Sequence, residues 1–294
     1  MPSQRQELLE SLLGQRVQIP DLQGLFSEWP LAVNPEVEKL RSFVSSSLKS
    51  KFIQNSAQYK VLDKMDIGLF TAVFWPDASL KRACVLSLLV IWLFAWDDEM
   101  DTEIGQLADD FEAAEACRRE SITKISHCFH LDDSSEQPEQ SNTFHDLLAI
   151  IGDAVSDNYG IEHLGRSYAD EIVLPMEVLM DPDMKVLQDQ VNLILWTMND
   201  LISLRKEIGE KAVDSLVPLL YYQTGNLDEA VSHVFYMMEK AIDRFDRAAN
   251  TLLEKFAGDT TLAENLSRYI QTCRKNCTGS LYWSVRTARY GQPK

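Results

Sequence analysis

The feature that most constrains the fold of this chain is a spacing of apolar residues by three and four positions through most of its length. The spacing is clearest in Val37–Leu48, Ser79–Trp96, Asp109–Cys128, Lys185–Glu207 and Asp228–Lys255. Apolar residues at these intervals share one face of an α-helix, whereas a half-buried strand would alternate every second residue. Such alternation is nearly absent, and 12 glycines and 10 prolines are few for a protein built on β-turns. The sequence therefore predicts an all-α bundle of roughly ten helices.

Prolines and polar segments indicate where these helices begin and end. Prolines at positions 20, 30 and 35 indicate an extended N-terminal lead over residues 1–35, and Trp75-Pro76-Asp77 indicates a break between two helices. Leu131–Ser141 is polar and predicts a loop. Asp181-Pro182-Asp183 predicts the start of a helix, with proline in its first turn. Because no internal repeat or separating linker is found, we expect one domain over residues 1–294.

Composition and charge narrow the classes of function. With 45 acidic and 28 basic residues the formal net charge is −17, which repels nucleic acids and anionic membranes, so we expect neither as a partner. An acidic protein that acts on an anionic substrate needs local positive charge, which a divalent metal supplies. The apolar run Val85–Trp96 is too short to span a bilayer. We see no secretory signal and expect a cytoplasmic protein whose five cysteines are reduced.

Three aspartates follow the most apolar stretch of the chain. Ser79–Trp96 has the composition of a buried helix, and Asp97, Asp98 and Asp101 come directly after it. Asp97 and Asp101 share a face, about 6 Å apart along the axis, near a helix C-terminus where the dipole disfavours negative charge. A bound Mg²⁺ ion, which takes carboxylate, water and phosphate oxygens as ligands, would stabilise this arrangement. The alternative is an acidic helix end in solvent, and for this motif alone both interpretations stay open.

A second set of oxygen-bearing residues follows the apolar segment Val191–Met198. Asn199, Ser203 and Glu207 are spaced four and four, so they face one way on a helix. Amide, hydroxyl and carboxylate oxygens form a set that Mg²⁺ accepts, and Lys206 beside them offers a cation to phosphate. The alternative, slightly favoured for this motif alone, is an exposed helix end with ordinary ion pairs. Two such helices in one chain instead favour a metal cluster that holds a diphosphate from both sides.

These ordered motifs resemble those of class I terpene synthases of the single-domain fungal or bacterial type. DDEMD at residues 97–101 fits the aspartate-rich motif, NDLISLRKE at 199–207 fits the second metal motif, and Arg289-Tyr290 resembles the C-terminal Arg-Tyr pair. LFSEWPLAVNP and FWPDAS nearer the N-terminus are also similar, so the resemblance runs from about residue 17 to residue 291. It implies a helical bundle around a central apolar cavity. It also implies three Mg²⁺ ions, with Mn²⁺ able to substitute, and cyclisation of a prenyl diphosphate.

The resemblance implies a role for each motif residue. Asp97 would bridge metal ions with support from Asp98 and Asp101, and another ion would be held by Asn199, Ser203 and Glu207. The diphosphate would be bound by Lys206, Arg289 and Tyr290. A carbocation needs a dry cavity with aromatic faces. The candidate walls, for each of which ordinary core packing is the alternative, are Phe70, Phe74, Phe94, Leu195, Trp196 and Trp283.

The segment between the motifs departs from the family pattern. A diphosphate-sensing arginine is expected there, but residues 150–160 read IIGDAVSDNYG, and Arg166 is the only lysine or arginine between Leu131 and Pro182. The segment also looks short by roughly one helix between Arg166 and Asp181. Three explanations stay open. Arg166 acts from an altered position, or mis-splicing or divergence removed a segment and left a weak or dead enzyme, or the pattern does not hold in this branch.

Three functions therefore compete. The first is a cyclase acting on a prenyl diphosphate, with farnesyl diphosphate favoured and geranylgeranyl diphosphate next. The second is an isoprenyl diphosphate chain-elongating transferase, which would have a second aspartate-rich motif where this chain has the Asn/Ser/Glu set. The third is a degenerate, non-catalytic all-α binding protein, favoured by the missing arginine. The motifs favour the cyclase, with a small-molecule prenyl diphosphate as partner and a homodimer as a further expectation.

Overall fold

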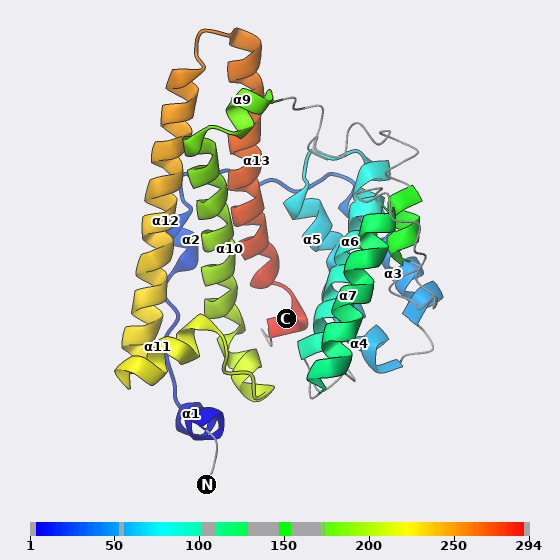
Figure 1. Ribbon diagram of the computed structural model, residues 1–294, viewed down its shortest axis with the longest axis vertical. Coiled ribbons are helices and arrows are strands. Elements are labelled where there is room, and N and C mark those ends of the chain that lie inside the picture. Colours follow the sequence, from blue (N-terminus) through cyan, green and yellow to red (C-terminus); the bar gives the residue numbers. More distant parts are fainter. Residues whose placement is uncertain are drawn as a thin grey trace. The chain divides into compact units, whose positions relative to one another are not determined.

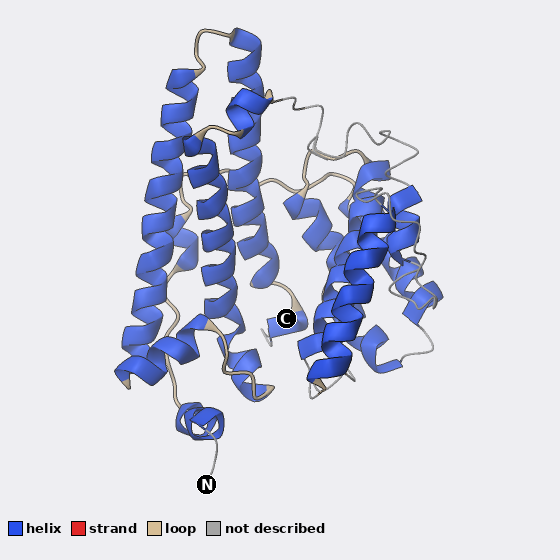
Figure 2. Cartoon of the chain, viewed as in Figure 1, coloured by secondary structure: helices blue, strands red, loops and turns tan. Residues whose placement is uncertain are grey.

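All described parts of this chain are helical or loop. The computed structural model describes residues 4–52, 56–101, 107, 110–128, 147–153, 172 and 174–290. Within these ranges it contains helices and no strand, as Figure 2 shows, so the all-α prediction is confirmed. Two compact units are present, one formed by Met1–Ala32 with Ile172–Lys294 and the other by Val33–Glu171. We call them unit 1 and unit 2. The single domain expected over residues 1–294 stays a prediction.

The predicted helical stretches correspond to helices of the structure. Unit 1 contains α1 (Gln4–Leu12), α2 (Leu22–Leu25), α9 (Met176–Leu179), α10 (Pro182–Gly209), α11 (Leu216–Thr224), α12 (Leu227–Lys255), α13 (Thr260–Ser284) and the 3₁₀ turn η2 (Ala288–Tyr290). Unit 2 contains α3 (Val37–Phe52), α4 (Ser56–Lys64), α5 (Ile67–Phe74), α6 (Leu80–Asp101) and α7 (Phe111–Cys128), with residues 147–153 also helical. The loop expected at Leu131–Ser141 lies outside the described residues.

Unit 1 is organised around three long helices. In Figure 1, α10, α12 and α13 run side by side, and their apolar faces form one buried core. Phe245 of α12 is fully buried there, and the ring of Trp29 packs on it at a centroid distance of 4.8 Å. Arg274 of α13 lies over both rings and donates to Asp246 over 2.7 Å. The segment after α2 is therefore held against α12 and α13 by the tilted packing of Trp29 on Phe245 and by the Arg274 guanidinium over the Trp29 ring.

The extended lead predicted over residues 1–35 is wrong in part, because two helices lie within it. Leu8 and Leu12 of α1 are four residues apart and both are buried in the core of unit 1. Asp21 caps α2 by accepting hydrogen bonds from the backbone N–H groups of Gln23 and Gly24. The prolines at positions 20, 30 and 35 limit the length of these helices without excluding them.

The predicted start of α10 is confirmed at Asp181. Its side chain accepts a hydrogen bond from the N–H of Asp183 over 2.9 Å, and Pro182 occupies the first turn. Lys255, at the end of α12, donates to the other carboxylate oxygen over 2.5 Å. Asp181 is buried, so this carboxylate joins the start of α10 to the end of α12. This ion pair fixes the position of α10, which carries the second motif, along the length of α12.

Replacing Asp181 with Ala is expected to lower the free energy of unfolding by about 1–2 kcal/mol, because α10 loses its cap and Lys255 its shorter ion pair. Urea unfolding followed by circular dichroism measures the change. The control is Asp189→Ala on the same helix, which removes an exposed ion pair with Lys185 and should cost under about 0.5 kcal/mol. Equal losses in the two variants would contradict a capping role.

The same carboxylate gives this difference a pH dependence. The hydrogen bond from Lys255 holds the pKa of Asp181 below its ordinary value of 3.8. A carboxyl group whose pKa is lower in the folded protein than in the unfolded chain stabilises the fold. This stabilisation is fully present when the pH is above the pKa of the unfolded chain, and it is lost as the pH falls through the pKa of the folded protein. The stability gap between wild type and Asp181→Ala should therefore be constant near neutral pH and narrow as pH falls below 3.8.

In unit 2, short bonds between α3, α5 and α6 support the helix that carries the aspartates. Asp66 has a left-handed backbone with φ of 49°, accepts a bond from the N–H of Leu69, and pairs with both Nε and Nη2 of Arg41. Ser87 of α6 donates to Thr71 of α5 over 3.1 Å inside the unit. The predicted break at Trp75-Pro76-Asp77 is confirmed, since α5 ends at Phe74 and α6 begins at Leu80.

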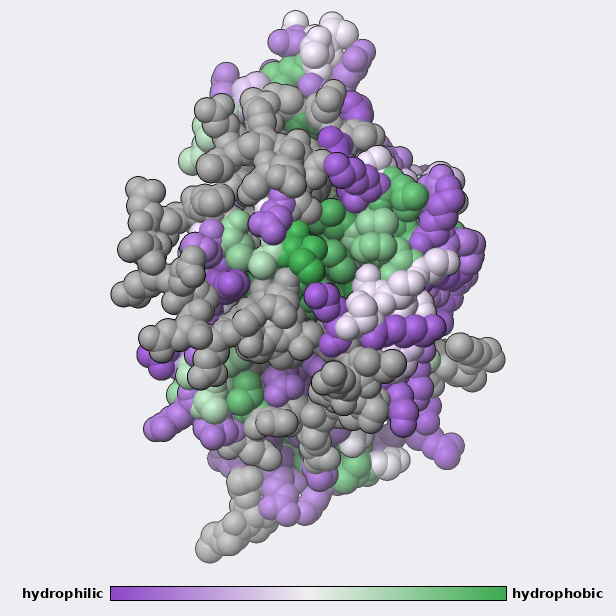
Figure 3. All heavy atoms as spheres, turned by 90° about the vertical axis from the view of Figure 1, so that its right-hand side faces the viewer, coloured by the Kyte–Doolittle hydropathy of each residue, from purple (hydrophilic) through white to green (hydrophobic). Residues whose placement is uncertain are grey.

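Some apolar side chains of the described residues are exposed to solvent, among them Leu13, Phe111 and Trp196. No described helix has the length and hydropathy needed to cross a membrane. Figure 3 shows one face, on which hydrophilic residues surround an apolar area. All five cysteines are free thiols, which agrees with the reduced state expected from the sequence. Burial raises the pKa of Cys273 to about 12, so this thiol stays protonated and is a poor nucleophile.

Candidate active site

The aspartate motif lies on the last turns of α6. The helix before it is buried at Val90, Ile91 and Ala95, as a long apolar lead-in predicts. Asp98 is 3% exposed and Asp97 is partly exposed, so the two neighbours differ in their access to solvent. Asp101 ends the helix, and its side chain lies outside the described part of the chain. Metal binding by these aspartates stays a prediction.

Three of the candidate cavity residues form an aromatic cluster in unit 2. The rings of Phe70 and Phe74 on α5 stack at 5.1 Å, and Phe94 of α6 meets Phe70 edge-on at 5.6 Å. All three side chains are partly exposed, unlike the fully buried residues around them. Phe94 lies three residues before Asp97 on the same helix. Phe94 therefore joins the aromatic cluster to the turn before the aspartate motif, and the role of the three rings as walls for a cation stays a prediction.

The second motif brings its oxygens together on one face of α10. Ser203 Oγ lies 2.5 Å from Glu207 Oε1 and 2.7 Å from the backbone carbonyl of Asn199, one turn earlier. Ser203 is buried, whereas Asn199 is exposed and Glu207 partly so. The spacing of four predicted this shared face, and the structure confirms it. Adjacent ligands of octahedral Mg²⁺ lie roughly 3 Å apart, so the serine and glutamate oxygens fit one such ion.

The C-terminal Arg-Tyr pair reaches this motif. The amide of Asn199 donates to the hydroxyl of Tyr290 over 3.0 Å, which joins η2 to α10 across 91 residues of sequence. Trp283 packs edge-on against Tyr290 at 5.9 Å and is 2% exposed, so it supports the tyrosine from within the core. The N–H of Arg289, between them in sequence, bonds to Thr287 Oγ1. The structure therefore places Tyr290 at the second motif, and its contact with diphosphate stays a prediction.

The remaining predicted residues have different surroundings. Trp196, one turn before Asn199, is 53% exposed, whereas Leu195 is partly buried and packs against the core. Lys206 forms an ion pair with Glu210 over 2.9 Å, so it would have to leave this partner to bind phosphate. Arg166 lies outside the described residues, and its role stays a prediction.

Sequence analysis did not predict a role for two residues that join the second motif to the start of α11, Asp200 and Ser215. Asp200 is 3% exposed, and its Oδ2 accepts a hydrogen bond from the N–H of Leu216 over 2.8 Å. Burial raises the pKa of Asp200 to about 6, against the opposing effect of this bond. Ser215 donates from Oγ to Glu207 Oε2 over 2.7 Å. The sequence offered little indication of either role. Asp200 lies inside the motif but outside the Asn199, Ser203 and Glu207 spacing, and Ser215 has the sequence position of an ordinary helix N-cap.

A metal at the second motif would depend on more than acidic side chains. In the described ranges no three His, Cys, Asp or Glu side chains converge in a way that could hold a metal ion. The oxygens available at α10 are instead one carboxylate, one hydroxyl and one amide. Mg²⁺ commonly completes its shell with water and substrate phosphate, so this set fits an ion that binds together with a diphosphate.

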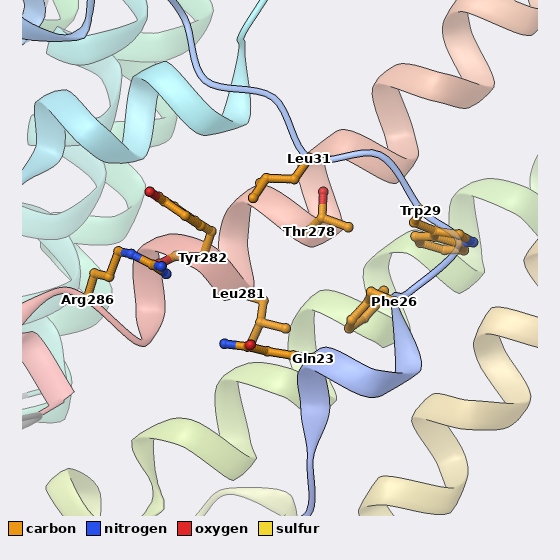
Figure 4. A pocket seen from close by; sticks show the side chains of 8 residues that line it. All are labelled: Gln23, Phe26, Trp29, Leu31, Thr278, Leu281, Tyr282 and Arg286. Carbon is orange, nitrogen blue, oxygen red and sulfur yellow. The ribbon is translucent and has the colours of Figure 1, made fainter.

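Two pockets of unit 1 lie beneath the N-terminal segment. One has a volume of about 260 Å³, and Figure 4 shows Phe26, Trp29 and Leu31 of that segment facing Leu281 and Tyr282 of α13. The other, of about 230 Å³, shares Gln23 and Leu281 with it. None of the predicted metal ligands, diphosphate contacts or cavity walls that the structure describes lines either pocket, although Leu201 and Ile202 within the second motif line the smaller one. The central cavity implied by the resemblance stays a prediction.

Part of the chain that contains the second motif matches a known family. Residues 167–244 match the family model "Terpene synthase family 2, C-terminal metal binding". This range contains α10 with the whole Asn/Ser/Glu set, together with Asp200 and Ser215. The metal-binding description of the family implies the use of a divalent metal.

Curated relatives match nearly the whole chain. The sesquiterpene cyclase hepA of Aspergillus oryzae is 26% identical, over 98% of this chain and 92% of the relative. The silphinene synthase peniA of Penicillium patulum is 28% identical, over 93% of this chain and 85% of the relative. The hepA alignment spans 342 positions, whereas this chain has 294 residues. The relative therefore has residues that this chain lacks, and the shortening predicted between Arg166 and Asp181 stays a prediction.

Solved structures agree on the fold. A hedycaryol synthase in complex with HEPES has a TM-score of 0.69 at 17% identity, with 91% of this chain and 98% of that chain covered. An α-eudesmol synthase has a TM-score of 0.70 at 14% identity, with coverage of 92% and 99%. At these identities the likeness concerns the arrangement of helices alone.

Proposed function

We propose that this chain, which matches a terpene synthase family model and curated terpene cyclases, is a class I terpene synthase. It uses Mg²⁺ to ionise farnesyl diphosphate and cyclises the resulting cation to a sesquiterpene. Relatives named as terpene or sesquiterpene cyclases support cyclisation of a prenyl diphosphate. The choice of farnesyl diphosphate rests on two named sesquiterpene enzymes among them, from Aspergillus oryzae and Cyclocybe aegerita. The choice of Mg²⁺ rests on the hard oxygen ligands of α10.

One observation carries the proposal: Asn199, Ser203 and Glu207 share a face of α10, and Tyr290 is hydrogen-bonded to the first of them. Residues that were predicted as metal ligands and as a diphosphate contact thus meet at one place, although 91 residues of sequence separate Asn199 from Tyr290. An acidic helix end exposed for solubility would not need a buried serine, a buried tyrosine and a tryptophan behind it.

Each group has a part in the proposed reaction. Mg²⁺, when bound, would supply positive charge that stabilises the leaving diphosphate. Asn199, Ser203 and Glu207 would hold one ion, Asp97 with its neighbours would hold others, and Tyr290 would contact the diphosphate. Phe70, Phe74 and Phe94 offer π faces to the allylic cation.

Two other functions remain as candidates. A chain-elongating transferase would bind its second metal group with aspartates, and the hydroxyl and amide at Ser203 and Asn199 disfavour it. A degenerate, non-catalytic binding protein is favoured by the sequence IIGDAVSDNYG at residues 150–160, which lacks the expected diphosphate-sensing arginine. The ordered hydrogen bonds around Glu207 count against it, because they keep a carboxylate and two hydroxyls at one point.

Product analysis separates the three functions. The purified chain is incubated with Mg²⁺ and, separately, geranyl, farnesyl, geranylgeranyl or geranylfarnesyl diphosphate. Hexane extracts are analysed by gas chromatography with mass spectrometry, and released diphosphate is measured in parallel. A cyclic hydrocarbon or alcohol from farnesyl diphosphate is the expected result. A longer diphosphate would identify a transferase, and no release from any substrate would leave the binding protein. Omission of Mg²⁺ should abolish diphosphate release.

The expected partners belong to the same proposal. The substrate is a small-molecule diphosphate, the protein is cytoplasmic, and two copies form a homodimer. Light scattering of the eluted protein would give twice the mass of the 33.5 kDa chain if this is right.

A further inference from the structure

The connection from α10 to α11 places a serine hydroxyl on the carboxylate of the second motif. The chain leaves α10 at Gly209 and enters α11 at Leu216. Ser215, directly before α11, donates from Oγ to Glu207 Oε2 over 2.7 Å. Ser203 Oγ lies 2.5 Å from the other oxygen, Oε1. Both oxygens of the Glu207 carboxylate therefore have a hydroxyl partner, one from α10 and one from the start of α11.

Ser215 makes this bond in place of the one that its position predicts. It occupies the N-cap of α11, where a serine side chain ordinarily accepts a bond from an N–H of the first turn. Its side chain makes no capping bond here. The N–H of Leu216 is bonded instead by Oδ2 of Asp200, over 2.8 Å. Asp200 thus takes over a capping bond and leaves the Ser215 hydroxyl to Glu207.

The pattern of donors separates the roles of the two carboxylate oxygens. A hydroxyl has one proton, and Ser203 Oγ lies within bonding distance of both the Asn199 carbonyl and Glu207 Oε1. When the Ser203 hydroxyl donates to the Asn199 carbonyl, a lone pair of Ser203 Oγ and one of Glu207 Oε1 lie side by side and are open to a cation. Ser215 donates to Glu207 Oε2, the carboxylate oxygen that does not face the cation, so this bond stays in place when Oε1 binds the cation. This bond opposes rotation of the carboxylate.

We propose that Ser215 is a positioning residue for the metal motif: its hydroxyl holds Glu207 Oε2 so that Oε1 is presented to the cation. Asp200 supports it by holding the backbone of α11 against α10. The inference rests on the proposed function, because it takes Glu207 as a metal ligand. Partners of metal ligands commonly change metal affinity by about tenfold to a hundredfold when removed, and we expect a loss in that range for Ser215.

Binding of Mn²⁺ in the presence of inorganic diphosphate tests this without turnover. Free Mn²⁺ is measured by electron paramagnetic resonance during titration of the full chain. Ser215→Ala and Ser215→Cys should raise the dissociation constant by about tenfold or more, whereas Ser215→Thr, which keeps the hydroxyl, should stay near wild type. The control is Ser42→Ala, which removes an exposed hydroxyl bonded to a helix carbonyl over 2.9 Å and should change nothing. Circular dichroism and melting temperature are recorded for every variant.

A parallel titration of Glu207→Gln separates two kinds of failure. If Glu207→Gln weakens Mn²⁺ binding but folded Ser215→Ala and Ser215→Cys do not, the positioning role is overturned and the proposed function stands. If wild type does not bind Mn²⁺ with diphosphate, or Glu207→Gln binds it equally well, the metal assignment of Glu207 is overturned together with the role of Ser215. Should Ser215→Ala unfold, Ser215→Cys decides, because it preserves the side-chain volume.

Discussion

Turnover is expected to fall by about a thousandfold or more when Asn199 is replaced by Ala and Glu207 by Gln in one protein. The double variant removes the amide oxygen and the carboxylate charge from the face of α10 on which Ser203 Oγ and Glu207 Oε1 lie 2.5 Å apart. Less positive charge is then held against the leaving diphosphate, so the barrier to ionisation rises. The measurement is release of diphosphate from farnesyl diphosphate at saturating Mg²⁺, with the helical circular dichroism spectrum nearly unchanged.

A matched control lies on α12, where Asn250 and Glu254 are also four residues apart and both are exposed. Asn250→Ala with Glu254→Gln makes the same chemical changes away from the motif and should leave turnover within about twofold of wild type. Asp97→Asn should abolish turnover in the same way as the motif variant. Activity retained in either Asp97→Asn or the Asn199 and Glu207 variant would mean that the metal cluster is misplaced.

Replacing Phe245 with Ala is expected to lower the free energy of unfolding by about 3–5 kcal/mol. Phe245 is fully buried, and its ring packs on Trp29 at 4.8 Å and lies beneath the guanidinium of Arg274 at 5.7 Å. The truncation leaves a cavity and also removes the surface on which the segment after α2 packs. Urea unfolding followed by circular dichroism measures the change.

Two further variants test the physical reason for this loss. Tyr236→Ala on the same helix truncates an aromatic side chain that is 55% exposed, and should cost less than about 1 kcal/mol. Trp29→Ala combined with Phe245→Ala should cost less than the sum of the two single changes, because the rings stabilise each other. A loss of under about 1.5 kcal/mol for Phe245→Ala would show that the core closes around the missing ring.

Much of this protein was determined locally by its sequence. The spacing of apolar residues depends only on the helical repeat, so it located α6, α10 and α12. Proline located the break at Trp75-Pro76-Asp77, because its ring fixes the local backbone. The start of α10 at Asp181 was predictable because a cap is made within three residues. The shared face of Asn199, Ser203 and Glu207 follows from a spacing of four and needs no knowledge of other helices.

Tertiary structure decided what no local spacing encodes. The helix α1 forms within the predicted extended lead because Leu8 and Leu12 find a core made by distant helices. Tyr290 meets Asn199 only because η2 folds back onto α10. Ser215 has the sequence of an N-cap, yet its hydroxyl binds Glu207, since Asp200 already supplies a bond to α11. A side-chain hydrogen bond depends on which elements become neighbours, and that choice is made by burial over the whole unit.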